Sequence, residues 1–498
     1  MPQGPYLLAI DQGTTSTRAM LFDGGARPVA SHAIALKQIY PANGWVEHDA
    51  EEIWQASLAC CREAAKGVAA KDIAAIGITN QRETTVLWDR ATQKPVHNAI
   101  VWQDRRTAER CRSLKEQGRE AFVVERTGLL LDPYFSATKL EWLLANVPGA
   151  KARAEKDALA FGTIDSWLIY RLTGGRVHAT DVTNASRTML LNIKTLAWDD
   201  EMLRMFGIPR AMLAEVRDSI ADFGTTDILG TPIPIMGVAG DQQAAAFGQA
   251  CFAPGDIKST YGTGCFVLVN TGAAATPSRN RLITTVAYRA GGKASYAIEG
   301  SIFIAGAVVQ WLRDALGIIH ASDEVEDLAA KAADIPGLYF VPAFTGLGAP
   351  YWDPDARGAI IGLTRDAGAP EIARAALDAV CYQTRDLLAA MAGDISTAGL
   401  SAPKALRVDG GMVKSDAFCQ RLTDLTGFVI ERPKVIETTA LGAAYLAGLG
   451  AGVFRSEADI AAHWALDKRF VPMLGAGKRD DLYDGWKKAV AHIRTRQK

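Results

Sequence analysis

The stretch YLLAIDQGTTSTRAMLFD (residues 6–23) decides the fold. Two apolar runs typical of β-strands, residues 6–10 and 18–23, enclose a turn rich in glycine, threonine and serine. Such a turn presents backbone N–H groups and hydroxyls to phosphate oxygens. Asp11, at the end of the first strand, is well placed for Mg²⁺ near those phosphates. The stretch therefore predicts a β-hairpin that binds a metal nucleotide, although a hairpin of this kind standing alone is more often structural.

Two later segments have the same character. Residues 240–264 contain GDQQ and YGTG, residues 408–412 read VDGGM, and each follows an apolar run of β type. The hairpin expected around residues 261–264 is the counterpart, in the second half, of the hairpin around residues 12–17. We therefore expect an α/β protein of two related domains with the active site in a cleft between them.

Length and charge agree with this plan. At 498 residues with 49% hydrophobic content, the chain is too long for one core, and we expect domains at residues 1–249 and 250–498. The net charge of −1 gives no field that would attract nucleic acid or an anionic membrane, which favours a small-molecule substrate. The sequence has no G-x-x-x-x-G-K-[ST], HRD or DFG motif, which excludes P-loop and protein-kinase machinery.

The cysteines and the chain start indicate the compartment. Seven cysteines occur without a C-x-x-C pair, which is typical of a reduced cytoplasmic protein. The start MPQGPYLLAIDQG lacks the basic and apolar regions of a signal peptide, and no run approaches the length of a membrane span. We expect a cytoplasmic protein without a membrane span.

Strand and helix patterns alternate along both halves. Apolar runs predict strands at residues 73–79 and 233–239, a hairpin over residues 258–270, and the end of a strand at residues 296–299. Helical spacing predicts helices over residues 51–67, 199–206 and 301–316. Residues 344–358, rich in proline and glycine, predict one long ordered surface loop.

Several residues at predicted strand ends have both a chemical and a structural interpretation. Asp241 follows the strand at 233–239, where a general base would be exposed, but a helix N-cap worth about 1 kcal/mol fits equally. Arg82 and Glu83 form a donor and an acceptor for vicinal hydroxyls, or a local ion pair. Trp102 and Phe266 would wall a pocket or fill the core.

The sequence resembles, essentially end to end, the glycerol kinases of the FGGY carbohydrate kinase family. The segments that carry the resemblance include YPANGWVEHDAEEIW (40–54), ITNQRETTVLWD (78–89), HATDVTNASRTMLLNI (178–193), AGDQQAAAFGQ (239–249), YGTGCF (261–266), FTGLGAPYWDPDARG (344–358) and RVDGG (407–411). The resemblance implies the ribonuclease H-like fold of actin and the sugar-kinase ATPases. It implies a polyol-binding N-terminal domain and a nucleotide-binding C-terminal domain.

The resemblance also implies a reaction and its residues. ATP with Mg²⁺ would phosphorylate glycerol to glycerol 3-phosphate, in glycerol uptake and catabolism, with Asp241 as the general base. The substrate-binding residues would be Arg82, Glu83, Trp102, Tyr134, Asp241, Gln242 and Phe266. The nucleotide-binding residues would be Thr14, Thr15, Ser16, Arg18, Thr263, Gly306, Gln310, Gly411 and Ser415, with Asp11 for the metal. From the residues alone, Arg18 fits a phosphate contact or a pair with an acid. A homo-oligomer, dimer or tetramer, is expected.

Ser415 departs from the family pattern, because many glycerol kinases have Asn at this place. One polar contact near the adenine is therefore expected to be absent or altered. Two other functions stay open: a kinase for another polyol or ketose such as erythritol or xylulose, and a non-catalytic nucleotide-dependent protein of the actin-like class. The second would be expected to lack Asp11 or Asp241, and both are present.

Overall fold

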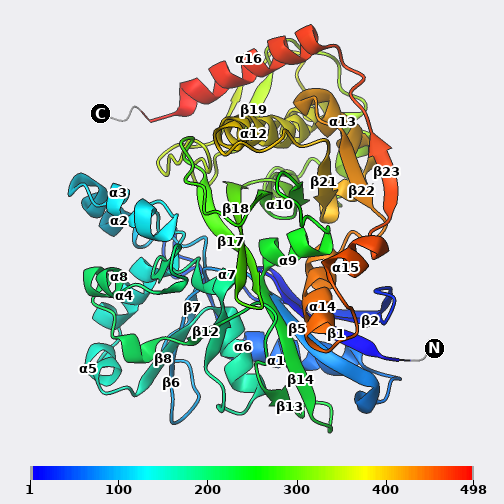
Figure 1. Cartoon of the computed structure of the whole chain (residues 1–498). Helices are drawn as coiled ribbons and strands as arrows, with labels where there is room; N and C mark the ends of the chain where they lie inside the picture. Colours follow the sequence, from blue (N-terminus) through cyan, green and yellow to red (C-terminus); the bar gives the residue numbers. More distant parts are fainter. Residues whose placement is uncertain (1–3, 496–498) are drawn as a thin grey trace.

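The computed structural model describes residues 4–495, which form two α/β halves, each built on a large twisted sheet (Figure 1). Residues 1–3 and 496–498 lie outside the described residues. They are the outer ends of the two predicted domains, and residues 1–3 also begin the stretch MPQGPYLLAIDQG that was compared with a signal peptide. The boundary expected at 249/250 stays a prediction.

The first sheet has the strand order β13-β14-β5-β1-β2-β3. β1 and β2 form the predicted antiparallel hairpin, and β5 and then β14 add to β1 in parallel. Because β1, β5 and β14 run in the same direction, their carboxyl ends meet at one edge of the sheet. The strands are β1 (Tyr6–Gln12), β2 (Ser16–Asp23), β3 (Pro28–Ala35), β5 (Ile73–Asn80), β13 (Thr225–Thr226) and β14 (Ile233–Gly240).

The second sheet has the order β17-β18-β16-β15-β21-β22-β23. In it β16-β15-β21-β22 repeats the order and the directions of β2-β1-β5-β14. This repetition confirms the expectation of two related domains. The strands are β15 (Ile257–Tyr261), β16 (Cys265–Gly272), β17 (Ile283–Ala290), β18 (Lys293–Ile302), β21 (Leu406–Asp409), β22 (Ile430–Pro433) and β23 (Leu466–Phe470).

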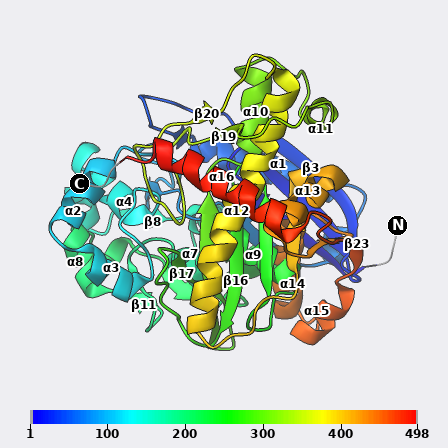
Figure 2. The same ribbon diagram turned by 90° about the horizontal axis from the view of Figure 1, so that it is seen from above.

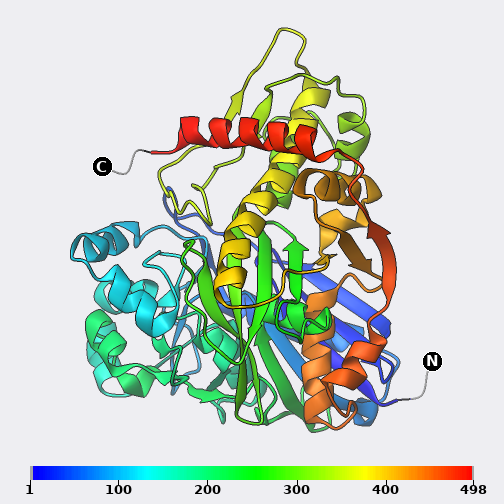
Figure 3. The ribbon, with the colours of Figure 1, turned by 45° about the horizontal axis from the view of Figure 1, so that its top comes forward.

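Helices cover the second sheet in two layers. The long α12 (Ala369–Thr397) lies over the sheet, and α16 (Ala476–Ile493) crosses over α12 (Figures 2 and 3). The ring of Trp486 stacks on that of Tyr382 with centroids 5.4 Å apart, which fixes this crossing. Other helices of this half are α10 (Gly306–Asp314), α11 (Glu324–Ala329), α13 (Asp416–Thr426) and α15 (Glu457–His463); a further one, α14 (Thr438–Gly450), packs on the first sheet.

The first half carries a large insertion between β5 and β14, drawn in cyan and green in Figure 1. It contributes the helices and short strands that close one side of the site. They are β6 (Val86–Asp89), β7 (Ala99–Ile100), α2 (Ala108–Glu116), α3 (Glu120–Thr127), α4 (Ser136–Asn146), α5 (Ala150–Glu155), β8 (Leu159–Gly162), α6 (Ile164–Leu172), β9 (Ala179–Asp181), α7 (Val182–Ala185), β10 (Leu191–Asn192), β11 (Ala197–Trp198), α8 (Asp200–Phe206) and β12 (Glu215–Arg217).

One helix of the second half packs on the sheet of the first. α14 (Thr438–Gly450) lies beside β1, β5 and β14 and crosses α9 (Asp241–Gly248) (Figure 1). Glycines allow backbone contact at this crossing: a Cβ added at Gly442 would lie 1.8 Å from the carbonyl oxygen of Ala244, and one at Gly248 would lie 2.1 Å from that of Thr438. The two halves therefore share one packed junction directly below the start of α9.

Most expected elements are confirmed, and three expectations are wrong. The helices expected at 51–67 and 199–206 are α1 (Ala50–Ala64) and α8. The helix expected over 301–316 is α10 alone, because Ser301 and Ile302 still pair with β16 as the end of β18. The same pairing extends the strand expected to end at 299. Residues 344–358 are irregular, as expected, but not a surface loop, because Leu347, Trp352 and Ala356 are buried.

Among residues 4–495, no helix is long and apolar enough to cross a membrane. All seven cysteines are buried and none forms a disulfide.

The α9–α14 crossing predicts a stability effect at Gly442. Gly442→Ala should lower the free energy of unfolding by about 3 kcal/mol, since the new methyl group meets a backbone atom that no rotamer change can move. Gly477→Ala in α16 is the matched control: nothing lies within 4 Å of its added Cβ, so helix propensity should raise stability by up to about 1 kcal/mol. Urea unfolding measures both, and equal stability of the two variants would contradict the proposed tight contact.

Candidate active site

A cleft of about 210 Å³ opens where the two sheets face each other. Its lining comes from both halves of the chain. The residues are Asp11, Gly13, Thr14, Thr15, Gln81, Arg82, Glu83, Trp102, Tyr134, Asp241, Gln242, Thr260, Gly262, Thr263, Gly264, Phe266 and Thr439. Eleven of the residues expected in the site are among them; Ser16, Arg18, Gly306, Gln310, Gly411 and Ser415 are not.

Asp241 lies at the junction of β14 and α9. Gly240 occupies the N-cap position, so Asp241 is the first helical residue and the alternative of an N-cap does not hold. Its Oδ1 accepts the N–H of Gln242 at 2.7 Å and lies 3.1 Å from Arg82 Nε. Burial raises the pKa of Asp241, while the charges of Arg82 and Lys258 oppose that rise. The side chain is 27% exposed, so this carboxylate faces the cleft and has room for a ligand.

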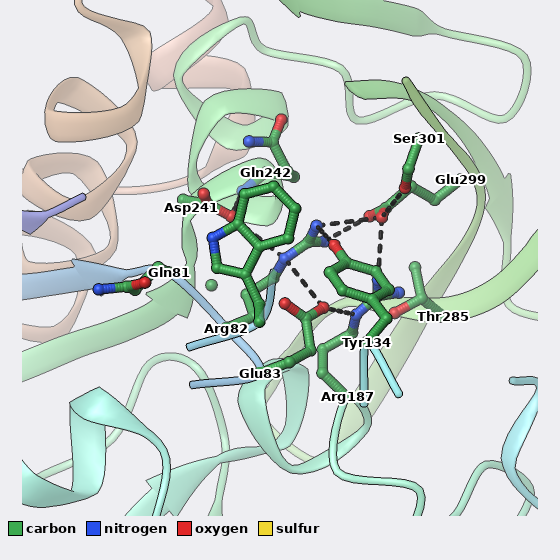
Figure 4. Close-up of polar contacts among 12 residues, drawn as sticks. Gln81, Arg82, Glu83, Tyr134, Arg187, Asp241, Gln242, Thr285, Glu299 and Ser301 are labelled. Carbon is green, nitrogen blue, oxygen red and sulfur yellow. Dashed lines mark hydrogen bonds and ion pairs between the residues drawn. The ribbon is translucent and has the colours of Figure 1, made fainter. Parts of the chain in front are cut away.

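Four charged side chains, of which Arg82 and Glu83 line the cleft, form a closed cluster. We call it the charge quartet: Arg82, Glu83, Arg187 and Glu299 (Figure 4). Arg82 donates hydrogen bonds from both terminal nitrogens to Glu299, with Nη2–Oε1 at 3.0 Å. Arg187 donates to Glu83 Oε1 at 2.7 Å and to Glu299 Oε1 at 3.0 Å. All four side chains are at most 2% exposed. Arg82 and Glu83 are therefore not merely a local pair but half of a network that joins the two halves of the chain.

The quartet fixes the orientation of Arg82. Besides Glu299 its guanidinium reaches Gln243 Oε1 at 3.2 Å, the hydroxyl of Tyr134 at 3.2 Å and Asp241. Burial alone would raise the pKa of Glu299, but Arg187 and Arg82 outweigh it and hold the pKa at about 2. Glu299 is thus ionised at neutral pH.

Aromatic rings form the part of the wall next to the quartet, where the Arg82 guanidinium lies 5.6 Å from the centroid of the Phe266 ring. Trp102 lies 5.6 Å from Tyr134 and 6.0 Å from Phe266 between ring centroids. All three rings are buried and also line the cleft, so they can pack in the core and still contact a ligand. The indole Nε1 of Trp102 donates to Thr14 Oγ1 at 2.8 Å, which connects this wall directly to the first Gly/Thr turn.

The first turn combines hydroxyls with an acidic group. Gly13 N–H donates to Ser16 O at 2.9 Å and closes the turn, while Thr14 and Thr15 point to the cleft. Burial raises the pKa of Asp11 to about 7; Arg18 opposes this rise, and Asp241 and Glu437 add to it. Arg18 pairs with Glu437. Of the two alternatives for Arg18, a phosphate contact or a pair with an acid, the structure therefore shows the pair with an acid.

The donor set at Asp11 fits a cation that arrives with phosphates. No group of three or more His, Cys, Asp or Glu side chains among residues 4–495 is arranged to hold a metal by itself. Mg²⁺ typically takes one or two carboxylates and completes its shell with water and phosphate oxygens. The raised pKa of Asp11 indicates a carboxylate whose charge a nearby cation would stabilise.

In the second half, three glycine-rich segments meet through their backbones. Gly306 N–H donates to Gly262 O at 2.9 Å, and a Cβ added at Gly410 would lie 2.5 Å from the carbonyl oxygen of Tyr261. The YGTG turn, the start of α10 and the VDGGM segment are thus brought together as expected. Gln310 is exposed on α10. Ser415 caps α13 by accepting the N–H of Phe418 at 2.9 Å.

The sequence interpretation missed Arg187, Glu299 and Lys258. Glu299 and Lys258 are charged residues within otherwise apolar or small-residue strands, YAIEGSI and IKSTY, and such a placement is itself a signal of a buried pair. Arg187 stands in the segment HATDVTNASRTMLLNI without a local partner in the sequence.

The quartet makes a prediction about acid stability. Glu299→Gln should lower the free energy of unfolding at neutral pH by about 3 to 5 kcal/mol, because two buried guanidinium groups lose a partner. The folded-state pKa of Glu299 lies at about 2, below its ordinary value of 4.5. The stabilisation is therefore complete above about pH 4.5 and is lost as the pH falls towards about 2.

Urea unfolding of the wild type and the variant from about pH 7 to about pH 3.5 measures this difference. The exposed Glu109→Gln is the control and should change stability by less than about 0.5 kcal/mol. A gap between wild type and Glu299→Gln that does not narrow in acid would contradict the charge assignment.

Solved and curated proteins resemble the whole chain. Glycerol kinase 1 of Pseudomonas aeruginosa is 60% identical, covering 98% of this chain and 99% of its own, and glycerol kinase of Methylobacterium nodulans is 59% identical, covering 97% of each. The crystal structure of Plasmodium falciparum glycerol kinase with ADP superposes with a TM-score of 0.87 at 38% identity, covering 98% of both chains. Ligand-bound xylulose kinase of Lactobacillus acidophilus gives 0.83 at 25%, covering 98% and 97%.

Two family models divide the sequence between them. The N-terminal domain of the FGGY family of carbohydrate kinases matches residues 6–248, and the C-terminal domain matches residues 257–451. Together with the repeated sheets and the cleft between them, these matches confirm the resemblance drawn from the sequence: the chain belongs to the FGGY family of carbohydrate kinases.

Proposed function

We propose that this chain is an ATP-dependent glycerol kinase, which transfers the γ-phosphoryl group of MgATP to glycerol and releases ADP and glycerol 3-phosphate. The observation that carries the proposal is the position of Asp241, a cleft-facing carboxylate at a helix start, held 3.1 Å from Arg82 and lining one cleft with both Gly/Thr turns. The curated relatives named glycerol kinase, about 60% identical over nearly the whole length, support the choice of glycerol.

The polyol would lie against the charge quartet and the neighbouring aromatic rings. Arg82, Glu83, Tyr134 and Gln242 offer hydrogen bonds to its hydroxyl groups. Trp102 and Phe266 would cover its carbon face. A small cleft lined by both polar groups and aromatic rings suits a short polyol, because each hydroxyl needs a partner and the carbons need none.

The nucleotide would lie across the two turns. Thr14, Thr15, Ser16 and Thr263 would donate to the phosphates, and Arg18 would reach them if it leaves Glu437. Asp11 would hold Mg²⁺, whose charge would stabilise the transferring group. Gly306, Gln310, Gly411 and Ser415 would border the nucleoside, with Ser415 limited by its bond to the N–H of Phe418.

The chemistry assigned to the protein is mainly positioning. The attacking hydroxyl oxygen of glycerol would form a bond to the γ-phosphorus while the bond from that phosphorus to the ADP oxygen breaks. Asp241 would accept the proton that this hydroxyl loses. Arg82 keeps the Asp241 carboxylate oriented through Nε. Closing the cleft would exclude water, which competes with glycerol as the acceptor.

The alternatives are weaker on specific grounds. A kinase for erythritol or xylulose shares the fold, but Arg82, Glu83, Trp102 and Phe266 together favour a three-carbon ligand. A non-catalytic actin-like protein has no need for a base such as Asp241 beside the phosphate turns. The proposal also includes a cytoplasmic location, supported by seven unpaired cysteines, and a homo-oligomer, dimer or tetramer, which light scattering would measure.

Substrate choice is tested by ADP release across glycerol, dihydroxyacetone, erythritol and xylulose. Glycerol should give the highest kcat/KM, because a longer chain leaves one hydroxyl without a partner among the aromatic rings. A higher kcat/KM with xylulose or erythritol would replace glycerol by that substrate. ADP release that no acceptor stimulates would favour the non-catalytic class.

The role of Asp241 is tested by Asp241→Asn. This variant should lower kcat by about 10²-fold or more, since general-base catalysis typically contributes about 10² to 10⁴, while glycerol still binds. Asp200→Asn, at an exposed helix start away from the cleft, is the control and should keep the wild-type kcat. A near-normal kcat in Asp241→Asn would remove this residue from the mechanism.

A further inference from the structure

A buried lysine lies directly behind the cleft. Lys258 belongs to β15, and its side chain is fully buried. Its Nζ lies 2.5 Å from Gln242 Oε1 and 2.9 Å from Thr260 Oγ1. Gln242 and Thr260 both line the cleft, whereas Lys258 does not. Two hydrogen bonds therefore connect the lysine with side chains that line the site.

The contact decides which end of the Gln242 amide faces the cleft. An ammonium group has three donors and no acceptor, so it can pair only with the amide oxygen. The amide nitrogen Nε2 is then turned away from the lysine. Within residues 4–495, no group accepts a hydrogen bond from Nε2, and Nε2 is not among the buried polar atoms without a partner. Gln242 thus offers the cleft a free donor.

Three carboxylates act on this lysine. Burial lowers the pKa of Lys258, and the charges of Asp409, Glu299 and Asp241 only limit that change. The contacts of Nζ with two side-chain oxygens are those of a hydrogen-bond donor. A hydrophobic residue at 258 would remove the charge that opposes the burial-driven rise in the pKa of Asp409, whereas Glu299 and Asp241 would keep Arg82. It would also free the amide of Gln242 to turn over, because a methylene chain has no preference between its oxygen and its nitrogen.

The contact also crosses the two halves of the chain. Lys258 lies in the second half, and β15 continues into the turn Tyr261–Gly264 that carries Thr263. Gln242 belongs to α9 of the first half, next to Asp241. One hydrogen bond therefore connects the strand leading to the nucleotide turn with a side chain on the polyol side.

We propose that Lys258 is a positioning residue that holds the Gln242 amide by its oxygen, so that Nε2 donates a hydrogen bond to a hydroxyl oxygen of the substrate. The inference rests on the proposed function, since the substrate hydroxyl is that of glycerol. It assigns Gln242 the part of a donor, complementary to the acceptors Glu83 and Asp241. A polyol hydroxyl, which both donates and accepts, can satisfy both kinds of partner at once.

A double-mutant cycle tests whether Lys258 acts through Gln242. Lys258→Met should raise the KM for glycerol by about tenfold, the loss of one oriented hydrogen bond, and the KM for ATP by less than about twofold. In a Gln242→Ala background the same substitution should change the glycerol KM by less than about twofold. An equal increase in both backgrounds would overturn the proposal, because Lys258 would then act independently of the amide. Lys293→Met, at an exposed strand position, controls for loss of a lysine.

A second variant keeps the test valid if Lys258→Met does not fold. Gln242→Glu retains an oxygen for Lys258 but replaces the amide donor by an acceptor. It should fold, and its glycerol Kd from calorimetry should rise by at least about tenfold. Wild-type affinity in this variant would mean that an oxygen faces the substrate, and the inference would be wrong. A wild-type enzyme that fails to phosphorylate glycerol overturns the proposed function instead, so the two failures are distinguishable.

Discussion

The backbone contact between α9 and α14 is the constraint on which the arrangement of the site depends. Gly442 meets the backbone of Ala244, and Gly77 and Gly237 of the first sheet meet the backbone of α14 at 2.1 Å and 2.3 Å from their added Cβ positions. A helix of the second half is thereby fixed on the sheet of the first. Because α9 begins with Asp241 and α14 brings Thr439 to the cleft, the same packing sets both the junction of the halves and the floor of the site.

Buried charge is used in two different ways within a short distance. In the charge quartet each guanidinium has two carboxylate partners, so the ions compensate one another and hold Arg82 in one orientation. Asp11 and Asp241 are compensated less completely: Arg18 acts on Asp11 and Arg82 pairs with Asp241 at 3.1 Å, yet burial still raises the pKa of both carboxyl groups. Carboxylates with a raised pKa in a cleft are costly without a ligand and useful with one, because a cation or a hydroxyl proton stabilises them. The quartet is structural support, and the two aspartates are left for chemistry.

The local sequence was sufficient to predict the two hairpin turns, but it was not sufficient to predict the charge quartet. The turns at 12–17 and 261–264 could be predicted because glycine and threonine chemistry and the flanking apolar runs lie within a few residues. The quartet could not, because Glu299 lies more than 200 positions from Arg82 and only the tertiary fold brings them together. The helix expected from residue 301 failed for a related reason: pairing with β16 holds Ser301 and Ile302 in a strand. The proline and glycine content of residues 344–358 likewise gave no sign that Trp352 would be buried.

The contacts between the two halves differ between the polyol side and the nucleotide side of the cleft. On the polyol side, the halves are already joined, by Glu299 to Arg82 and by Lys258 to Gln242. On the nucleotide side, the ion pair of Arg18 with Glu437 joins the halves, but within residues 4–495 no hydrogen bond joins Thr14 or Thr15 to Thr263, although all three line the cleft. Under the proposed function, the polyol contacts are therefore preassembled and selectivity for the acceptor is set before the halves close. Closure then has one remaining task, to bring the two turns onto the phosphates, and its energetic effect falls on phosphoryl transfer rather than on recognition of the polyol.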